Sequence, residues 1–468
     1  MATDDKPRVL IVGAGIGGLL LGALLEKASV PYIIFERTSS VKPLGSALAV
    51  GSNLLALFTQ LGIHDDFVAL GKITAHCTIS RENEGPLMTL DFLPKAEMSG
   101  YPQYVVARPL FYDLLLKQVP PHKIHFNKRI LSIKDEDEKI IIQAADNSVH
   151  EGEILVGADG AYSAVRQRLY EQLKKDSRLP KSDAVDLPFS CTCLVGQTRR
   201  IDFEQVFPEF KGPLCPFYNT MAENEPFTYV LFSTAQETVT WMVIHHLDRI
   251  SSKAAEEHRF RESENSEWGP HAAQAMCDET KHLPLPIGSK KMTMGDIYDL
   301  TPKEQISKVM LEEKVFDTWH SGRTVLLGDA CHKLDPSGGH GAVTSMHDAL
   351  AIANLIYALP PHPSTKDIEN SFAEYRDERR PAAVAAFKNS QMMAKFMDRG
   401  FAGAFALFLM KNVPLWLWRI FLARSIRQRP QAGFLDEVAN KGTVPADVSP
   451  STEKARAVYL NRQGAASL

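Results

Sequence analysis

A short apolar run that breaks into glycines near the start of the chain most constrains the fold. Residues 8–12 read Arg-Val-Leu-Ile-Val, and residues 19–26 resume an apolar pattern that is typical of a helix. Between them, Gly13, Gly15 and Gly18 have the spacing G-x-G-x-x-G. In such a unit the first glycine permits a tight turn, the second lets backbone approach a pyrophosphate, and the third lets helix and strand pack closely. The stretch therefore predicts a dinucleotide-binding strand–turn–helix unit.

An acidic residue follows the glycines at the distance that a dinucleotide site requires. Residues 31–35 predict a second strand, which ends at Glu36 with Arg37 beside it. A carboxylate roughly 20 residues past the glycines is placed to accept a hydrogen bond from a ribose hydroxyl. The alternative, a glycine-rich turn without a ligand, does not account for the acid at this position.

The composition is that of an ordinary globular protein and excludes only a few classes. Of 468 residues, 44% are hydrophobic and 23% are charged, and the formal net charge is −4. This length predicts about two to three domains, and the charge provides no basic field for nucleic acid. The six cysteines are scattered without a CxxC pair or a metal-ligand spacing. We therefore expect reduced thiols in an intracellular protein, and no metal site.

Strand and helix patterns alternate along most of the chain and favour an α/β fold. Apolar runs at 154–156 and 324–327 predict buried strands, and residues 187–248 predict strand after strand. Residues 343–359 predict a long apolar helix.

Three segments have a more polar pattern. Residues 304–314 are predicted to be helical, and the charged stretch 251–282 to be helix-prone and solvated. From Gly442 onward, Pro, Ser, Thr and charged residues predict a frayed end.

Two later strands also end in turns that contain glycine. One turn contains Asp159 and Gly160, and the other contains Asp329. A glycine-rich loop then leads to Gly341 and Ala342, where the long apolar helix is predicted to begin. Each turn alone is common, but three of them at strand ends indicate backbone that meets an extended ligand.

In this order and at these distances, the motifs resemble the signature of the class A flavoprotein monooxygenases. These are single-component, FAD-dependent enzymes of the p-hydroxybenzoate hydroxylase type. The resemblance covers about residues 8–385 and is closest to the fungal secondary-metabolism branch that acts on aromatic polyketides, meroterpenoids and indole terpenes. It implies a Rossmann-like FAD-binding domain (three-layer ββα) interleaved with a mixed β-sheet substrate domain, plus C-terminal helices.

The pattern and the resemblance together predict how the domains divide the chain. We expect residues 1–73, 105–185 and 301–360 in the FAD-binding domain, 74–104 and 186–300 in the substrate domain, and 361–468 in the C-terminal helices and tail.

The resemblance also implies a task for each motif. It implies that the FAD pyrophosphate is held by the first glycines, Gly13, Gly15 and Gly18, and the adenosine ribose by Glu36, with Arg37 beside it. It further implies these roles: Arg108 reaches back to FAD, Asp159 and Gly160 contribute to FAD and NAD(P)H binding, Asp329 contacts the ribityl chain, and Ala49, Gly341 and Ala342 lie beside the isoalloxazine.

The reaction that the resemblance implies uses FAD, NADPH or NADH, and O2. The flavin would carry oxygen as a C4a-hydroperoxide and hydroxylate or epoxidise a hydrophobic aromatic or isoprenoid substrate. A helix beginning near Ala342 would direct its positive end at the flavin edge where negative charge collects on reduction. His340 stands where the family has a glutamine. We expect it to donate the same hydrogen bond, and titration beside the flavin is the alternative.

Aromatic residues in the middle of the chain are candidates for lining the substrate pocket, although core packing explains most residues of this kind. They are Phe217, Tyr218, Phe227, Tyr229 and Trp241. We single out Tyr218 as the candidate for a hydroxyl that faces the substrate.

The apolar stretch 401–423 stands apart from these motifs. A lysine, a proline and an arginine interrupt it, which disfavours a spanning helix. Trp416, Trp418 and the basic residues that follow suit a helix in a membrane interface. The alternative is a helix that packs on the enzyme or lines the entrance for a hydrophobic substrate. We expect a cytoplasmic protein, peripheral to an intracellular membrane if the first interpretation holds.

Two alternative functions remain open from the sequence. One is a flavin oxidase or dehydrogenase on the same fold, without oxygen insertion. The other is a binding protein without enzymatic activity, similar to the GDP dissociation inhibitors, but these should lack the full set of Glu36, Arg108, Asp159 and Asp329. The sequence indicates neither the identity of the substrate nor the oligomeric state.

Overall fold

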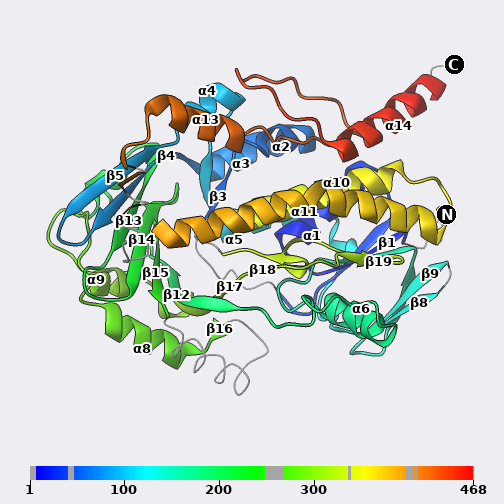
Figure 1. Ribbon diagram of the computed structural model, residues 1–468, viewed down its shortest axis with the longest axis horizontal. Coiled ribbons are helices and arrows are strands. Elements are labelled where there is room, and N and C mark those ends of the chain that lie inside the picture. Colours follow the sequence, from blue (N-terminus) through cyan, green and yellow to red (C-terminus); the bar gives the residue numbers. More distant parts are fainter. Residues whose placement is uncertain are drawn as a thin grey trace.

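The computed structural model describes residues 7–40, 47–136, 138–247, 267–335, 339–396, 405, 408, 409 and 411–466. Its strands form two large sheets that lie side by side, with the longest helices across one of them (Figure 1). The predicted α/β class is confirmed.

The first sheet is the parallel sheet that the opening motif predicts. Its order is β19 (His320–Ser321), β20 (Thr324–Leu326), β11 (Ile154–Gly157), β1 (Val9–Val12), β2 (Tyr32–Phe35) and β7 (Ile124–His125). All neighbours pair in parallel except β19 and β20. Since β1 and β11 are buried at every position, as expected for a sheet covered on both faces, their sequences read as continuous apolar runs.

A three-stranded sheet and a layer of helices cover the two faces of the parallel sheet. The small sheet consists of β10 (Val149–Gly152), β9 (Lys139–Ala144) and β8 (Ile130–Glu136). Its His150 ring packs on Phe35 of β2, with the ring centroids 4.7 Å apart. The opposite face carries α1 (Ile16–Lys27), α10 (Gly341–Ala358) and α11 (Thr365–Phe396). This is the three-layer ββα arrangement.

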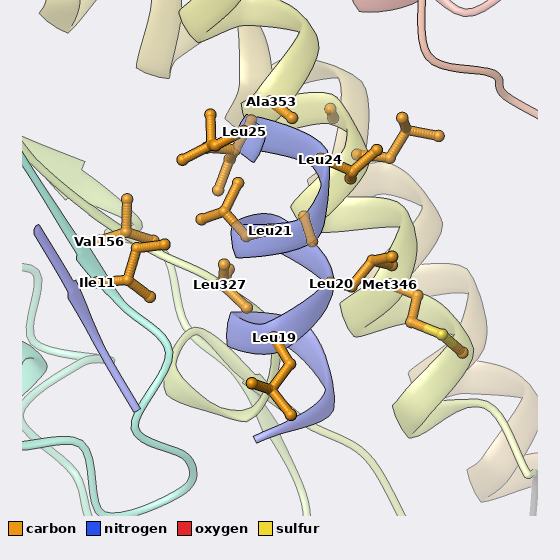
Figure 2. Packing of buried hydrophobic residues seen from close by; sticks show 14 of the residues in the cluster. Ile11, Leu19, Leu20, Leu21, Leu24, Leu25, Val156, Leu327, Met346 and Ala353 are labelled. Carbon is orange, nitrogen blue, oxygen red and sulfur yellow. The ribbon is translucent and has the colours of Figure 1, made fainter. Parts of the chain in front are cut away.

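Helix α1 lies between the parallel sheet and α10. Every residue from Ile16 to Leu25 is buried. Figure 2 shows Leu21 on the side of Ile11, and Leu20 on the side of Met346 of α10. A helix that is apolar all round is expected to be buried on all sides, and α1 meets that expectation.

The second sheet is mixed, as predicted for the substrate domain. Its order is β16 (Glu267–Trp268), β17 (Ser307–Glu312), β12 (Phe189–Gln197), β15 (Val239–His246), β14 (Phe227–Ser233), β13 (Leu214–Met221), β4 (Gly71–Arg81), β6 (Tyr104–Ala107) and β3 (Ala47–Val50), with β5 (Gly85–Asp91) paired to β4. Only β13 and β4 pair in parallel. Thus β3, β4, β5 and β6 build one sheet with β12 to β17, while the exact domain boundaries stay a prediction.

Shorter elements connect and cover the sheets. These are α2 (Leu55–Leu61), α3 (His64–Leu70), α4 (Pro94–Ser99), α5 (Arg108–Leu116), α6 (Ala164–Lys175), α8 (Pro270–Thr280), α9 (Met294–Asp299), and the strand pair β18 (Lys314–Val315) and β21 (His332–Lys333).

Two predictions of local structure were wrong. Residues 304–314 contain strand β17 instead of a helix, because pairing with β12 and β16 overrides the helix propensity of the Lys, Leu and Glu residues. Residues 251–282 are not solvated throughout: 248–266 lie outside the described residues, but α8 buries Met276 and Cys277.

The prediction of a frayed end was also wrong. Helix α14 (Pro450–Ala466) packs against α10, and Figure 1 shows it at the C-terminal end of the fold. The Asn354 side chain of α10 donates to the Thr452 hydroxyl at 3.2 Å, and its oxygen accepts from Gly433 N at 2.8 Å. The tail composition predicted disorder because these partners lie about 80 to 100 residues away in sequence.

Gly433 tests how tightly this end of the chain is packed. A Cβ at Gly433 would lie 2.3 Å from the Thr452 carbonyl oxygen and 2.7 Å from Arg456 N. We expect Gly433→Ala to destabilise the fold by about 1–3 kcal/mol, measured as a lower Tm by calorimetry. Gly464→Ala is the control: a Cβ there meets no atom within 4 Å, so a helical Ala should leave Tm unchanged or raise it. Equal Tm values for the two variants would contradict this packing.

Candidate functional site

Gly13, Gly15 and Gly18 follow β1, and each has a different surrounding. Gly13 has φ +109°, and a Cβ there would lie 2.4 Å from the Ala158 carbonyl oxygen. A Cβ on Gly18 would lie 2.0 Å from the Gly13 oxygen. A Cβ on Gly15 would meet nothing within 4 Å. Two glycines therefore allow protein backbone to pack closely, whereas Gly15 faces open space at the N-terminus of α1, where free N–H groups attract phosphate.

Glu36 lies beside this loop, as the sequence predicts for a ribose acceptor. One carboxylate oxygen accepts from Ala14 N at 3.0 Å, and the other accepts from Thr38 N at 3.0 Å and from the Thr38 hydroxyl at 2.9 Å. A carboxylate offers about four acceptor sites, so capacity remains for a hydroxyl. Arg37 is exposed directly after it.

The second turn is held by a hydrogen-bonded helix cap. Asp159 accepts from the Ser163 hydroxyl at 2.5 Å and from Val165 N at 3.2 Å, and Ser163 in turn accepts from Arg166 N at 2.9 Å. Burial raises the pKa of Asp159, although these hydrogen bonds oppose the shift. Gly160 has φ +81° and no atom within 4 Å of a built Cβ, so the turn has an open side.

The third turn brings Asp329 and Arg108 together. Asp329 lies in a 3₁₀ turn, Gly328–Ala330, and accepts from Lys333 Nζ at 2.7 Å. Burial raises the pKa of Asp329, but the charges of Lys333, His332 and Arg108 outweigh it, and the pKa lies below its usual value. Arg108 begins α5 in the neighbouring segment. Arg108 and Asp329, to which the resemblance assigns FAD contacts, are therefore close enough for their charges to interact.

A buried carboxylate, not found from the sequence, fixes the third turn. Asp348 of α10 accepts from Gly328 N at 3.1 Å, from His332 Nε2 at 2.5 Å and from Arg379 Nε at 2.9 Å. Burial raises its pKa, but the charges of His332 and Arg379 outweigh this and hold the pKa below its usual value. The only signal in the sequence was one Asp in the apolar run 343–359.

The same cluster has the ligand atoms of a metal site. Cys331, His332 and Asp348 place one ligand atom each within 4.8 Å of one another. The Arg379 guanidinium already occupies the Asp348 carboxylate and repels a cation. We therefore assign these side chains to holding the turn.

Arg166 ties the second turn to the third. It is 7% exposed, and its guanidinium donates to the carbonyl oxygens of Ala161 and Ala330 at 2.5 and 2.9 Å. Sequence reasoning missed this role because the two acceptors are 169 residues apart (330 − 161).

The far end of the site lies at the start of α10. Gly339 and Gly341 flank His340, and a Cβ on either glycine would meet no atom within 4 Å. Gly341 and Ala342 form the first turn of α10, where backbone N–H groups have no helical partner. Although His340 is exposed at the surface, the protein atoms around it lower its pKa, and the charge of Lys95 lowers it further. This shift favours the neutral form of His340, which its expected hydrogen-bonding role requires.

Lys95 of α4 is a third group that the sequence did not reveal. Its Nζ donates to the Gln103 amide oxygen at 2.8 Å and lies 5.1 Å from the centre of the Phe92 ring. Burial lowers the pKa of Lys95 to about 8. Because its charge acts on His340, Lys95 places positive charge near the N-terminus of α10.

One face of the mixed sheet lies near Asp335, in the segment that precedes α10. That face consists of Val105, Cys215, Val230, Phe232, Ala47, Phe217 and Met242, and continues with Cys191, Cys193, Ile244 and Leu311. Burial raises the pKa of Cys193, and the charge of Asp335, five residues before His340, adds to it. Ala49 lies on the same face as Ala47, because side chains alternate along a strand.

Tyr218 lies on the opposite face of the sheet. Its ring packs edge-on against Phe210 at 5.8 Å, in a cluster beside α8 and α9 that also contains Phe227, Tyr229 and Trp241. Of the five aromatic candidates, only Phe217 lies on the Ala47 face, where it stacks on Phe232 with centroids 4.6 Å apart. The structure therefore brings the glycine turns, Arg108 and Asp329 together but separates Tyr218 from them.

Gly15 and Gly18 allow FAD binding to be separated from folding. We expect Gly15→Ala to leave Tm unchanged, because its Cβ meets no protein atom, and to weaken FAD binding at least about tenfold by blocking close approach of a phosphate. Gly18→Ala should lower Tm even without FAD, because its Cβ would overlap the Gly13 oxygen. Calorimetry and FAD titration of the apoprotein measure both effects. Wild-type FAD affinity in Gly15→Ala would contradict this role of Gly15.

Solved structures share this fold. The chain is similar to HpxO of Klebsiella pneumoniae in complex with FAD and uric acid, with a TM-score of 0.67 and 16% identity over 88% of this chain and 95% of that one. It is also similar to CtdE in complex with FAD and a substrate, with a TM-score of 0.64 and 15% identity over 88% and 95% of the two chains.

Relatives of known sequence and the family comparison agree. The chain is 27% identical over 407 residues to the FAD-dependent monooxygenase paxM of Penicillium paxilli, covering 84% of this chain and 79% of the relative. It is 24% identical to the FAD-dependent monooxygenase atmM of Aspergillus flavus, covering 94% and 89%. The family described as FAD binding domain matches residues 6–282 and 290–390. The chain therefore belongs to the FAD binding domain family and is an FAD-dependent monooxygenase.

Proposed function

We propose that the chain uses NAD(P)H and O2 to hydroxylate or epoxidise a hydrophobic aromatic or isoprenoid substrate in secondary metabolism. The observation that carries the proposal is the apolar face of the mixed sheet at the Gly341 end of the FAD site. Hydrophobic side chains of β3, β6, β13, β14 and β15 pack together on this face, from Ala47 to Met242. Such a surface favours a ligand that is itself apolar, and the stacked pair of Phe217 and Phe232 favours a flat one.

A few polar atoms on this face support oriented binding of a substrate oxygen. Thr74 pairs with Cys215, Thr240 alternates with Met242, and Asn219 alternates with Phe217, so all three belong to the Ala47 face. Among the described residues, Thr74 Oγ1, Thr240 Oγ1 and Asn219 Oδ1 are buried without a hydrogen-bond partner. Buried polar atoms normally have hydrogen-bond partners, and a hydroxyl or carbonyl group of a bound substrate would supply a partner for these three atoms.

The proposed reaction is balanced by one reduced nicotinamide. One oxygen atom of O2 enters the substrate, the other leaves as water, and NAD(P)H supplies two electrons while a solvent proton completes the water. FAD, when bound, supplies the electron transfer and the activation of oxygen. The open glycines Gly15, Gly160 and Gly341 fit such a ligand along its length.

The residues of the chain contribute position and charge. The first turn of α10, from Gly341, directs free N–H groups to where negative charge gathers on flavin reduction, and the Lys95 ammonium adds to that field. Neutral His340 can donate one hydrogen bond there. The apolar sheet face keeps water from the reacting atoms.

The proposed electron donor is NADH or NADPH. The sequence contains one G-x-G-x-x-G unit with a following acid, at Gly13–Gly18. This favours transient binding of NAD(P)H over the flavin instead of binding in a dedicated domain. We propose a cytoplasmic location, which the free thiols of all six cysteines support.

Labelled oxygen tests the proposed reaction. With ¹⁸O2 and NADPH or NADH, we expect one heavy atom in the product of a prenylated aromatic substrate, measured by mass spectrometry. A flavin oxidase or dehydrogenase would give product without label, and the label would then appear only in peroxide or water. A colourless protein that FAD cannot reconstitute would favour the binding protein without enzymatic activity.

The pKa of Lys95 predicts a pH-dependent flavin potential. Its charge is present below pH 8 and is lost as the pH rises through about 8. We expect Lys95→Met to lower the flavin midpoint potential by about 10–40 mV at pH 7, and by much less above pH 9. The exposed Lys290→Met is the matched control and should not change the potential. A Lys95→Met effect that is the same at both pH values would contradict this assignment.

A further inference from the structure

Helix α13 (Leu415–Ser425) is attached to the protein by one side only. Leu422 and Ile426 are 2% exposed and pack on Met98 at the end of α4. Trp418 Nε1 donates to the Asp91 carbonyl oxygen at 2.9 Å, and Arg419 pairs with Glu97 at 3.3 Å. Figure 1 shows α13 beside α4, above the edge of the mixed sheet. These contacts fix the helix on the substrate-domain segment that carries Lys95.

The other side of α13 carries large apolar side chains that are exposed. Trp416 is 64% exposed, Ile420 53% and Phe421 52%, and Leu415 at the N-terminus of the helix is 82% exposed. Phe405, Phe408 and Leu409, shortly before the helix, are each more than half exposed. We call Leu415, Trp416, Ile420 and Phe421 the outer face. Large apolar side chains on a helix are normally buried, as those of α1 are. Within the part of the chain that the structure describes, the outer face therefore has no partner.

The charges around the outer face indicate what covers it. Residues 411–429 contain five basic residues and no acidic residue. Of the five, Arg419 pairs with Glu97, Arg427 pairs with Asp447, and Arg429 is buried. Lys411 and Arg424 are exposed. Tryptophan next to basic side chains on an apolar helix is typical of a helix that lies in the headgroup region of an anionic bilayer. Among the described residues, no helix is long and apolar enough to cross a membrane.

A second copy of the chain fits this face less well. In a symmetric dimer the same surface patch meets itself. Lys411 and Arg424 would then face a patch that carries the same two basic residues, and like charges at an apolar contact are unfavourable. Anionic lipid headgroups neutralise these charges, and the acyl region accepts the aromatic rings.

We propose that the outer face of α13 binds the surface of a bilayer that contains anionic lipids, with the helix lying in the interface. Binding of this kind is peripheral and reversible, because one short apolar face and a few basic residues provide it. It orients the α4 edge of the substrate domain towards the lipid. The proposal concerns attachment alone and does not depend on the reaction.

Flotation of the FAD-loaded full chain with vesicles tests the proposal. We expect binding to phosphatidylcholine vesicles that contain 30% phosphatidylserine, and weaker binding to pure phosphatidylcholine or at high salt. Trp416→Ser with Ile420→Ser should weaken binding at least tenfold. Lys411→Glu with Arg424→Glu should weaken binding to the anionic vesicles and leave binding to neutral vesicles unchanged. Val448→Ser is the control, because Val448 is apolar, 77% exposed and in the same tail.

Three outcomes would overturn the proposal. They are no binding to either vesicle, equal binding by the Trp416→Ser/Ile420→Ser variant, and a concentration-dependent dimer that this variant abolishes, which would assign the face to a second copy. The FAD content and the rate of NAD(P)H oxidation are measured on the same samples. If the protein does not float with vesicles but keeps its FAD and its NAD(P)H oxidation, only the proposal of membrane binding is rejected. If it floats but does not oxidise NAD(P)H, only the proposed reaction is rejected.

Discussion

The close approach of two backbone turns is the constraint on which the site depends. A Cβ on Gly13 would lie 2.4 Å from the Ala158 oxygen, and a Cβ on Gly18 would lie 2.0 Å from the Gly13 oxygen. The ends of β1 and β11 can therefore lie side by side only because the first turn carries no side chains at these points. That contact leaves Gly15 open between the turns. The cofactor-binding surface thus depends on the close packing of these turns.

Buried polar groups then fix the turns that glycine alone leaves free. Asp348 holds the third turn through Gly328 N and His332, and Arg379 of α11 neutralises it. Arg166 binds the carbonyl oxygens of both later turns. Such groups are costly to bury and strongly destabilising to break when one partner is removed. They make the position of Asp329 depend on α6, α10 and α11 together.

The three turns were predictable from the sequence because each is encoded within a few residues of one strand end. Asp348, Arg166 and Lys95 were not, because their partners lie on elements far along the chain. Phe217 and Tyr218 illustrate a different limit. Adjacent strand residues must face opposite ways, so at most one of them can face the flavin. The hydroxyl of Tyr218 made it the better candidate from the sequence. The pairing of β13 in the sheet decides which face the Tyr218 side chain takes.

Helices α1 and α13 show why composition alone does not locate a helix. Both carry many large apolar side chains, and such side chains need a partner that removes them from water. For α1, the parallel sheet and α10 supply it within the chain (Figure 2). For α13, the α4 edge covers one side, and the described chain leaves Trp416 and Ile420 exposed. Burying two such side chains is worth about 3–6 kcal/mol. That gain is enough to favour an external apolar surface and too small to hold the protein there irreversibly.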